Sequence, residues 1–305
     1  MTDVFHQGER TVQTWAGETA IAEGNSRMIA HSIAKGAISF VEKQPMAIVG
    51  SSNGEQELWA SLLIGSVGFV KVPDPDTIIF DTQRLISNPA DIFYSNITHN
   101  SQIGGLFIEL DSRKRLRVNG TCRVENSKIE CTVHQAFPNC PRYIQRRVME
   151  LPEYFERTPS RSTEGTVLTA SFINWIQGAD TLFVASAGPD GHLDASHRGG
   201  NPGFVEITAD GALKIPDYPG NSLFSTFGNL LQHPRAGLLF IDFENRQTLQ
   251  LTGTTSLLFD QTAASDLLKT KGTGRYWFFH PTRWIHTVDH HRVGWNFLEY
   301  SRFNP

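Results

Sequence analysis

Two stretches of this chain repeat one another, and this repeat restricts the possible folds more than any other feature of the sequence. Residues 45–70 (PMAIVGSSNGEQELWASLLIGSVGFV) align without a gap with residues 180–205 (DTLFVASAGPDGHLDASHRGGNPGFV). A second pair follows in the same order, residues 104–124 (GGLFIELDSRKRLRVNGTCRV) with residues 237–257 (GLLFIDFENRQTLQLTGTTSL). Matched blocks in one order predict two copies of one fold within a single chain.

A third, weaker pair sets FPNCPRYIQ, which begins at Phe137, against FFHPTRWIH, which begins at Phe278. The repeats divide the chain into three parts. We expect a helical lead-in and the first barrel in residues 1–150, a linker rich in proline and charge in residues 151–162, and the second barrel in residues 163–305.

Each copy has the pattern of short antiparallel strands. Val, Ile, Phe, Leu and Thr dominate the matched runs, and a turn at Asn53–Gly54 or at residues 189–191 (PDG) joins the first two of them. The segments IELDSRKRLRV and IDFENRQTLQL read as hairpins. The predicted fold is therefore mainly β with small helices, as tandem antiparallel barrels.

Three segments are predicted to be helical from their apolar spacing and capping residues. They are residues 26–44 with Asn25 or Ser26 as the cap, residues 164–180 with Ser162 or Thr163 as the cap, and residues 222–234, which Pro234 ends. In the first copy, residues 81–100 occupy the place of this third helix but are interrupted by Pro89.

Composition excludes several classes of protein. Charged residues make up 19% of the 305 residues and the net charge is −4, so we expect a globular protein and neither a nucleic-acid partner nor a membrane surface. No apolar run approaches the roughly eighteen residues of a membrane span, and the first thirty residues lack the apolar segment of a signal peptide. A cytoplasmic protein is expected.

Several familiar sites are absent from the sequence. Three cysteines, with no CxxC pair, predict reduced thiols instead of disulfides or structural zinc. No GxSxG elbow and no Rossmann fingerprint occur. Lys271–Arg275 (KGTGR) lacks the remainder of a phosphate loop and is predicted to be a surface turn. The spacing of the histidines between His280 and His291 fits no particular metal site, so no metal is predicted.

The segment SHRGG, at residues 196–200, stands out within the second copy. A turn needs glycines but has no use for a cationic Arg198 beside a hydroxyl and an imidazole, whereas an anion would use all of them. Gly199 and Gly200 would let the backbone approach such a ligand closely. The first copy has LLIG at the corresponding place, so only the second copy carries the cation.

These residues carry a resemblance to a known family. FHQGERTVQTWAG, LWASLLIGSVGFV, RLRVNG and QAFPNCPRYIQRR resemble the pyridoxamine 5'-phosphate oxidase-like, FMN-binding split-barrel family, in its branch with two barrels in one chain. DASHRGGNPGFV and the segment from Lys214 to Ile241 are similar to the general pattern of that family. The resemblance covers nearly the whole chain and implies antiparallel split barrels that bind FMN between them.

The chemistry of FMN then suggests which residues would hold it. The phosphate needs charge-assisted donors, the ribityl chain needs polar groups, and the ring needs flat or apolar surfaces. The residues expected at the phosphate and the ribityl chain are Ser196, His197, Arg198, Gly199, Asp217, Asn221, Ser222 and Thr226. Those expected at the ring are Trp59, Tyr143, Trp277 and Trp284, with backbone donors beside Ala60 and Ser61.

Three functions remain open at this stage. The first is a flavin-dependent oxidoreductase that acts on a small molecule or takes electrons from NAD(P)H, and it is the one that we expect. The second is a flavin carrier or redox sensor without catalysis, and the third is a haem-binding split barrel, for which the histidine-rich end is the hint. No catalytic side chain is predicted, because the cofactor would supply the chemistry. A homodimer is a further expectation.

Overall fold

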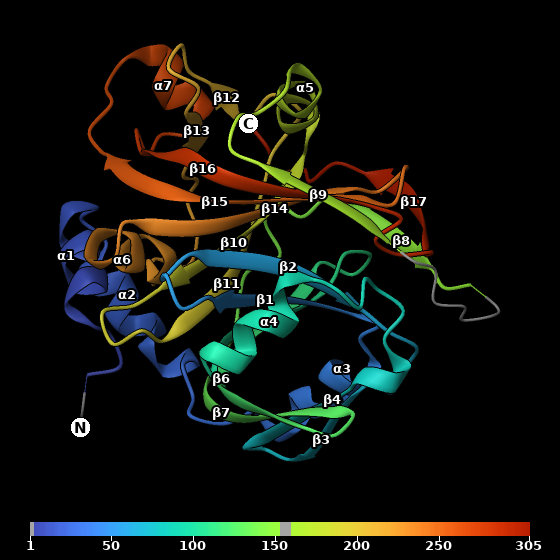
Figure 1. Ribbon diagram of the computed structural model, residues 1–305. Helices are drawn as coiled ribbons and strands as arrows, with labels where there is room; N and C mark the ends of the chain where they lie inside the picture. Colours follow the sequence, from blue (N-terminus) through green and yellow to red (C-terminus); the bar gives the residue numbers. More distant parts are fainter. Residues whose placement is uncertain (1–2, 153–159) are drawn as a thin grey trace.

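The computed structural model describes residues 3–152 and 160–305, and it contains two large antiparallel sheets with the same strand order. The first runs β2-β1-β5-β6-β7-β4-β3, and the second runs β11-β10-β14-β15-β16-β13-β12. In Figure 1 the first sheet forms the lower half of the molecule and the second the upper half. The predicted fold, mainly β with small helices and tandem split barrels, is confirmed.

The strands of the first sheet all lie within the first half of the chain. They are β1 (Met46–Ser52), β2 (Leu58–Ile64), β3 (Val70–Asp74), β4 (Thr77–Asp81), β5 (Gln102–Glu109), β6 (Lys114–Glu125) and β7 (Lys128–Pro138). Those of the second sheet are β10 (Thr181–Ala187), β11 (Leu193–Gly199), β12 (Glu206–Ile207), β13 (Leu213–Pro216), β14 (Arg235–Asp242), β15 (Gln247–Leu258) and β16 (Tyr276–Val288).

The sequence repeat is a repeat of structure. The hairpins β1–β2 and β10–β11 pair in the same way, with Gly50 opposite Ala60 and Ala185 opposite Ala195. The third and weakest sequence match is wrong in register. A bulge sets Gly120 opposite Val133 in the first sheet and Gly253 opposite Pro281 in the second. When the two bulges are aligned, residues 137–145 and 278–286 do not coincide. Residues 137–145 leave the sheet at Pro138, whereas residues 278–286 all lie inside β16.

The strands at the seam between the halves are apolar on both faces. In β1, Ala47 and Val49 belong to the core of the first barrel, whereas Ile48 faces the seam. In β10, Val184 belongs to the second core and Phe183 to the seam. Because successive side chains of a strand point to opposite faces, a strand between two cores must be apolar throughout.

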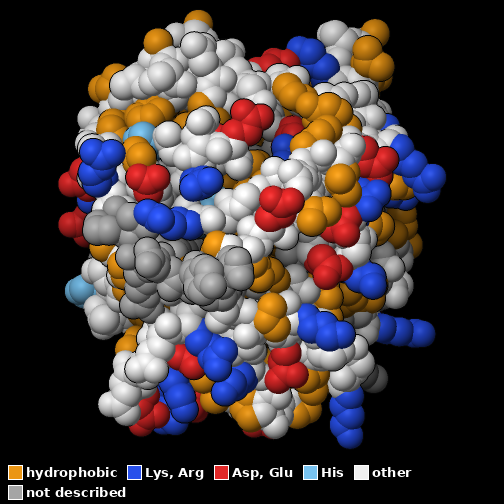
Figure 2. All heavy atoms as spheres, turned by 90° about the vertical axis from the view of Figure 1, so that its right-hand side faces the viewer, with side chains coloured by type: hydrophobic (Ala, Val, Ile, Leu, Met, Phe, Trp, Pro, Cys, Tyr) orange, Lys and Arg blue, Asp and Glu red, His pale blue; other side chains and the backbone are white. Residues whose placement is uncertain are grey.

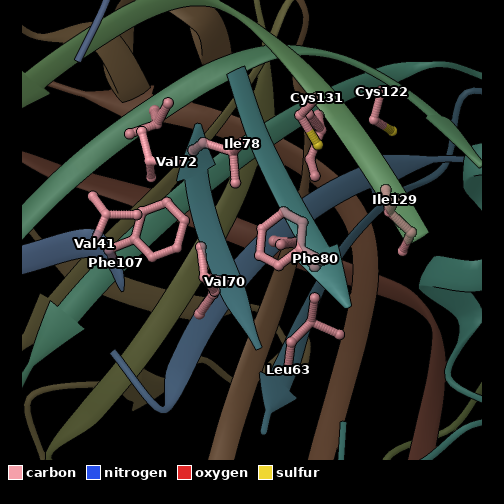
Figure 3. Packing of buried hydrophobic residues seen from close by; sticks show 14 of the residues in the cluster. Val41, Leu63, Val70, Val72, Ile78, Phe80, Phe107, Cys122, Ile129 and Cys131 are labelled. Carbon is pink, nitrogen blue, oxygen red and sulfur yellow. The ribbon is translucent and has the colours of Figure 1, made fainter. Parts of the chain in front are cut away.

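Each half also has a core of its own. Figure 3 shows the first core, where side chains from β3, β4 and β5 meet. The rings of Phe80 and Phe107 stack there with their centroids 6.2 Å apart and an angle of 11° between their planes. The second core includes Trp277 and Phe240, both fully buried. Each barrel thus buries aromatic side chains independently of the seam.

Matched glycines allow the two halves to approach closely. A Cβ atom on Gly104 would lie 2.5 Å from the backbone of Asp194, and one on Gly237 would lie 2.5 Å from the carbonyl oxygen of Leu58. These glycines begin the second pair of repeated blocks, so the duplication uses one position in the same way twice. Backbone lies against backbone at both places, and neither contact leaves room for a side chain.

Replacing Gly237 with alanine is expected to lower the free energy of unfolding by about 1–3 kcal/mol, because the added methyl group overpacks the seam. Urea denaturation measures this change. Gly24 is the matched control, since a Cβ atom there meets nothing within 4 Å. Gly24→Ala lies in a helix and should leave stability unchanged or raise it slightly. Equal stabilities of the two variants would contradict the close approach.

The helices are short and lie at the ends and edges of the sheets. They are α1 (Gln7–Trp15), α2 (Thr19–Asn25), α3 (Lys35–Lys43), α4 (Ile92–His99), α5 (Ala170–Gly178), α6 (Ser225–Gln232) and α7 (Ala264–Lys269), with 3₁₀ turns η1 (Ser26–Met28) and η2 (Thr82–Arg84). Helices α4 and α6 occupy equivalent places in the two copies, and α4 begins after Pro89, where the sequence predicted an interruption.

All three predicted helices are shorter than expected, and two of them lack their predicted caps. Residues 26–44 form η1, a bridge between Ala30 and Ala136, and then α3, so Asn25 and Ser26 do not cap one long helix. Ser162 and Thr163 lie in strand β9 (Arg161–Gly165), which pairs with β16. Thr169 is the cap of α5, because its hydroxyl accepts from the N–H of Phe172 at 3.3 Å. Strand pairing with β16 outweighed the local capping signal.

Segments of each half also reach the other. Strand β8 (Arg146–Glu150) pairs with β17 (Gly294–Glu299) near the end of the chain. Helix α1 packs against α6, since a Cβ atom on Gly8 would lie 2.3 Å from the carbonyl oxygen of Gly228. Figure 1 shows α1, α2 and α6 side by side. Residues 153–159 of the predicted linker lie outside the described residues.

The surface on the side of β8 and β17 has a mixed character. Figure 2 shows Lys and Arg side chains there interspersed with acidic and hydrophobic ones. Within residues 3–152 and 160–305, no helix is long enough and apolar enough to cross a membrane.

Candidate functional site

A basic cleft opens between the two halves at the edge of the seam. Its walls come from β6 and the loop after β7 in the first half, and from β11, the loop after β13 and the start of α6 in the second. We call it the basic cleft because five arginines and one aspartate line it: Arg115, Arg117, Arg142, Arg198, Arg275 and Asp217. Its volume is about 100 Å³. Such a concentration of cations favours an anionic ligand.

Asp217 holds two of these arginines in place. Its Oδ1 accepts from Arg198 Nη1 at 2.8 Å and its Oδ2 accepts from Arg275 Nε at 3.0 Å. Arg275 Nη1 also donates to Glu18 Oε1 at 2.9 Å, and the other oxygen of Glu18 accepts from the Ser222 hydroxyl at 2.5 Å. The cations are therefore oriented before any ligand arrives, which reduces the entropy lost on binding.

Arg198, which lines the cleft, has a donor atom without a partner in the described part of the chain. Its Nε is buried and has no hydrogen-bond partner among the described residues, although the side chain as a whole is 21% exposed. An unpaired buried donor is costly unless a ligand or water satisfies it. Its guanidinium lies over the ring of Phe227, 5.6 Å from the centroid, so its plane is fixed by an aromatic contact as well as by Asp217.

The first turn of α6 adds backbone donors to the same wall. Ser225, Thr226 and Phe227 all line the cleft. The N-cap residue, Phe224, has left-handed backbone angles with a φ of 59°, and its side chain does not cap the helix. The first N–H groups of a helix have no partner within the helix and carry partial positive charge, so an uncapped start of this kind suits an anion.

His197 lies on the floor of the cleft as a neutral imidazole. Arg115 Nη1 donates to His197 Nδ1 at 3.2 Å, which leaves the ring proton on Nε2, where no residue in the described part of the chain accepts it. Burial, and then the nearby arginines, hold the pKa of His197 well below its usual value. Burial likewise lowers the pKa of Arg115 to about 10.

A buried ion pair joins the halves behind the cleft. Arg117 Nη1 donates to Asp194 Oδ2 at 2.7 Å, and Asn119 Nδ2 donates to Asp194 Oδ1 at 3.2 Å. The two charged side chains are only 12% and 6% exposed. Burial raises the pKa of Asp194 and lowers that of Arg117, while each charge favours the charged form of its partner.

Tyr143 and Gly199 close one wall by direct contact. A Cβ atom on Gly199 would lie 2.2 Å from the carbonyl oxygen of Tyr143, so only glycine fits there. Tyr143 has a φ of 64°, its hydroxyl donates to the carbonyl of Pro219 at 3.1 Å, and its ring lies 4.7 Å from that of Tyr218. Burial raises the pKa of Tyr143 to about 12, so the phenol is neutral.

The structure brings together most of the residues predicted at the phosphate end. Those that line the cleft are His197, Arg198, Gly199, Asp217, Asn221, Ser222 and Thr226, together with Tyr143, which had been expected at the ring. Ser196 lies beneath them, and its hydroxyl accepts from the Thr226 hydroxyl at 3.1 Å. Asn221 uses its side-chain oxygen to accept from the N–H of Leu223 at 3.2 Å.

The structure does not bring the three predicted tryptophans into the cleft. Trp59 is fully buried at the seam, where its backbone lies against Gly237. Trp277 is part of the core of the second barrel. Trp284 packs against Phe172 of α5, and its Nε1 donates to the carbonyl of Val167 at 2.9 Å. Each ring serves packing, as is usual for tryptophan in a β-rich domain.

Ala60 and Ser61 also lie outside the basic cleft. Gln250 Nε2 donates to the carbonyl of Ala60 at 3.0 Å and to the Ser61 hydroxyl at 2.9 Å. The Ser61 hydroxyl in turn donates to Asp91 Oδ1 at 2.6 Å. These contacts fill the place that is equivalent, in the first copy, to the basic cleft.

The place in the first copy that is equivalent to the basic cleft has apolar side chains where the second copy has His197 and Arg198, and it is filled. Residues 62–64 (LLI) stand in β2 where residues 197–199 (HRG) stand in β11, and they are fully buried. His290 covers them, with its Nε2 3.0 Å from the carbonyl oxygen of Leu62. The duplicated fold, as far as the structure describes it, therefore carries one open basic cleft and one sealed counterpart.

Several residues of the cleft were not anticipated. Arg115 and Arg117 lie two apart in β6 and so share a face, a spacing visible in RLRVNG. Arg275 belongs to KGTGR, predicted to be a surface turn, yet it is 5% exposed and faces Asp217. Glu18 lies shortly after α1 and is far in the sequence from Arg275, to which it is bonded. No local sequence pattern predicts that contact.

The histidines near the end of the chain do not gather around one point. His280 is exposed, and His286 Nε2 lies 2.7 Å from Gln247 Oε1. His290 and His291 are buried at the sealed place. Within the described part of the chain, no group of His, Cys, Asp or Glu side chains is arranged to hold a metal ion.

Comparisons with known proteins find similarity only among solved structures. No family model matches the sequence, and no curated protein matches it. The chain is similar to HupZ of Group A Streptococcus, at 12% identity over 44% of this chain and 98% of that one, with a TM-score of 0.32. It is also similar to a putative pyridoxamine 5'-phosphate oxidase from Lactobacillus delbrueckii, at 14% identity over 38% of this chain and 92% of that one, with a TM-score of 0.32. An FMN-binding protein from Syntrophomonas wolfei matches at 11% identity over 42% of this chain and 95% of that one, with a TM-score of 0.26.

Proposed function

We propose that this protein binds FMN through its basic cleft and works as a flavin-dependent oxidoreductase on a small molecule or on NAD(P)H. The observation that carries the proposal is the Nε of Arg198, unpartnered within the described residues, at a wall formed also by the uncapped start of α6. A dianionic phosphate would satisfy both kinds of donor at once.

The residues present fit the phosphate end of the cofactor. Arg198 and Arg275 are oriented by Asp217, and the hydroxyl of Ser222 lies beside them. The sequence resemblance to FMN-binding split barrels supports FMN over other phosphate-bearing ligands. The cleft volume of about 100 Å³ admits a phosphate group, whereas ligand pockets usually measure about 300–1,000 Å³, so the remainder of the cofactor would extend beyond it.

When bound, the flavin would supply hydride and electron transfer, and the protein would supply binding and surroundings. Arg198 and Arg275 would neutralise the phosphate. His197, which is buried and neutral, would offer its Nε2 proton as a hydrogen-bond donor at the floor of the cleft. The cleft of the second copy predicts one flavin per chain, because the equivalent place in the first is filled by Gln250 and His290.

Replacing Arg198 with alanine is expected to weaken FMN binding about 10- to 150-fold, the loss of a charged hydrogen bond worth about 1.5–3 kcal/mol. Quenching of flavin fluorescence during titration measures the dissociation constant. Arg123→Ala is the matched control, since Arg123 lies on β6 with its side chain 67% exposed and outside the cleft. Equal affinity of the two variants would count against the phosphate site.

Bleaching of the flavin absorbance by NADH or NADPH distinguishes the oxidoreductase from a flavin carrier. Rapid bleaching in the absence of oxygen, followed by recovery when an acceptor is added, supports the enzyme. A flavin that binds one per chain but stays oxidised under both donors supports the carrier.

A further inference from the structure

A second and larger hollow adjoins the basic cleft, and its lining has the opposite charge. We call it the acidic cavity; its volume is about 530 Å³, within the range of small-molecule sites. It lies where the N-terminal segment, β6, β7 and the β10–β11 turn meet. Among the described residues, its lining includes four acidic side chains, from Asp3, Glu9, Asp190 and Asp194, four histidines and no lysine or arginine. Asp3 is paired with Arg10 and Asp194 with Arg117, so Glu9 and Asp190 are the acidic groups that an ion pair with arginine does not balance.

The floor of the acidic cavity is built from buried polar groups. Glu9, Asn119, Asp194 and Asn229 are each between 4% and 8% exposed. Asp3 and Asp190 lie at its exposed rim. Buried polar side chains are costly unless they are paired. Glu9, Asp194 and Asn229 have partners within the protein, so the unmet need on this floor lies at Asn119.

Asn119 presents an acceptor without a partner. Its Nδ2 donates to Asp194 Oδ1 and to Gln135 Oε1, both at 3.2 Å, which fixes the orientation of the amide. Its Oδ1 is buried and accepts no hydrogen bond from residues 3–152 or 160–305. An ordered water or a ligand donor would satisfy this atom, and for a ligand beside carboxylates an N–H group is the natural donor.

His6 adds no positive charge to the cavity. Its Nδ1 accepts from the N–H of Gly8 at 3.1 Å, so its proton lies on Nε2, which faces Asn229 Oδ1 at 3.0 Å. Both ring nitrogens are thus occupied in the neutral form. The positive partner of Asp194 is Arg117, which lines the basic cleft instead.

From this lining we infer that the acidic cavity binds a small molecule through a protonated amine. The ammonium group would donate to Asn119 Oδ1 and lie beside the Glu9 carboxylate, and its charge would be attracted by the acidic lining. Ser225 lines both hollows, so the amine would bind next to the basic cleft. This binding does not require FMN, because neither the four acidic residues nor Asn119 line the basic cleft.

Three probes of one shape and different charge test the inference: benzylamine, benzyl alcohol and benzoate. Calorimetric titration of the full chain at pH 8 should show benzylamine bound at least ten times more tightly than either of the others. Glu9→Gln, which keeps the shape and removes the charge, should weaken benzylamine binding at least tenfold. It should leave the binding of benzyl alcohol unchanged.

Arg198→Ala separates this inference from the proposed function. That variant should keep its affinity for benzylamine while it loses affinity for FMN. Crystals soaked in benzylamine check the position of the amine if calorimetry detects binding in the wild type. Equal affinity for the three probes, or benzylamine binding unaffected by Glu9→Gln, would overturn the amine site whatever the result with FMN.

Discussion

Replacing Asp194 with alanine is expected to lower the free energy of unfolding by about 3–5 kcal/mol, because it leaves the buried guanidinium of Arg117 without its counter-charge. The two side chains are 6% and 12% exposed and 2.7 Å apart. Arginine does not lose its proton at any ordinary pH, so the variant cannot escape the cost by neutralising itself. Burial already lowers the pKa of Arg117, which shows that its surroundings disfavour an unpaired cation.

Urea denaturation measures this loss of stability. Two further variants serve as comparisons. Glu130→Ala breaks the exposed pair with Arg123 and should cost no more than about 1 kcal/mol. A double variant with leucine at both Arg117 and Asp194 should recover most of the lost stability, since it buries no charge. If Asp194→Ala costs no more than Glu130→Ala, the ion pair does not hold the two halves together.

The second large effect is a loss of stability as the pH rises from about 4.5 to about 7. Burial raises the pKa of Glu9 to about 7, from about 4.5 for an ordinary glutamate. The folded state then binds more protons than the unfolded chain between these values, so stability falls with increasing pH. The contribution is fully present below about pH 4.5 and is lost as the pH rises through 7; its size is about 3 kcal/mol.

The groups around Glu9 come from four elements: α1 with its N-cap, β6, β11 and α6. On its own helix, the N–H of His6 donates to Glu9 Oε2 at 3.0 Å. Asp194 of β11 raises the pKa of Glu9, whereas Arg117 of β6 and the Ser225 side chain lower it, and burial outweighs all of them. The carboxyl group is therefore protonated in much of the folded protein at neutral pH.

Glu9→Gln isolates this contribution, because the amide oxygen can still accept from the N–H of His6. Free energies of unfolding measured from pH 5 to pH 8 should fall more steeply in the wild type than in the variant. At pH 8 the variant should be more stable by about 3 kcal/mol. Parallel pH profiles for the two proteins would mean that Glu9 is ionised in the fold.

Local patterns accounted for much of the fold and for one wall of the site. The runs of Val, Ile, Phe, Leu and Thr in the matched blocks placed β1, β2, β10 and β11 and their turns, because strand preference and turn chemistry act within a few residues. The segment SHRGG pointed to an anion, and the structure lines the basic cleft with residues 197–199. Local reasoning failed for Ser162 and Thr163, where pairing with β16 overrode a capping pattern.

The aromatic residues show why the rest of the candidate site could not be predicted from the sequence. Trp59, Trp277 and Trp284 stand in the matched blocks, but which face of a strand meets a ligand depends on what packs against it. Trp277 faces the second core, and the ring of Trp59 lies under the guanidinium of Arg283 from the other half of the molecule. Tyr143 and Tyr218 meet at the wall of the basic cleft although they lie on segments from different halves.

The amino-acid sequence by itself determined that the chain folds as two copies of one β-rich unit, since the repeat and the strand pattern are local properties. It also determined that only the second copy keeps a cation in the SHRGG position. Tertiary structure decided that Arg115, Arg117, Arg198 and Arg275 share one cleft, and that Glu9, Asn119 and Asp194 share a cavity of opposite charge. Those groupings arise from the docking of one half and the N-terminal helices against the other, and contacts between distant segments leave no periodic trace in a sequence.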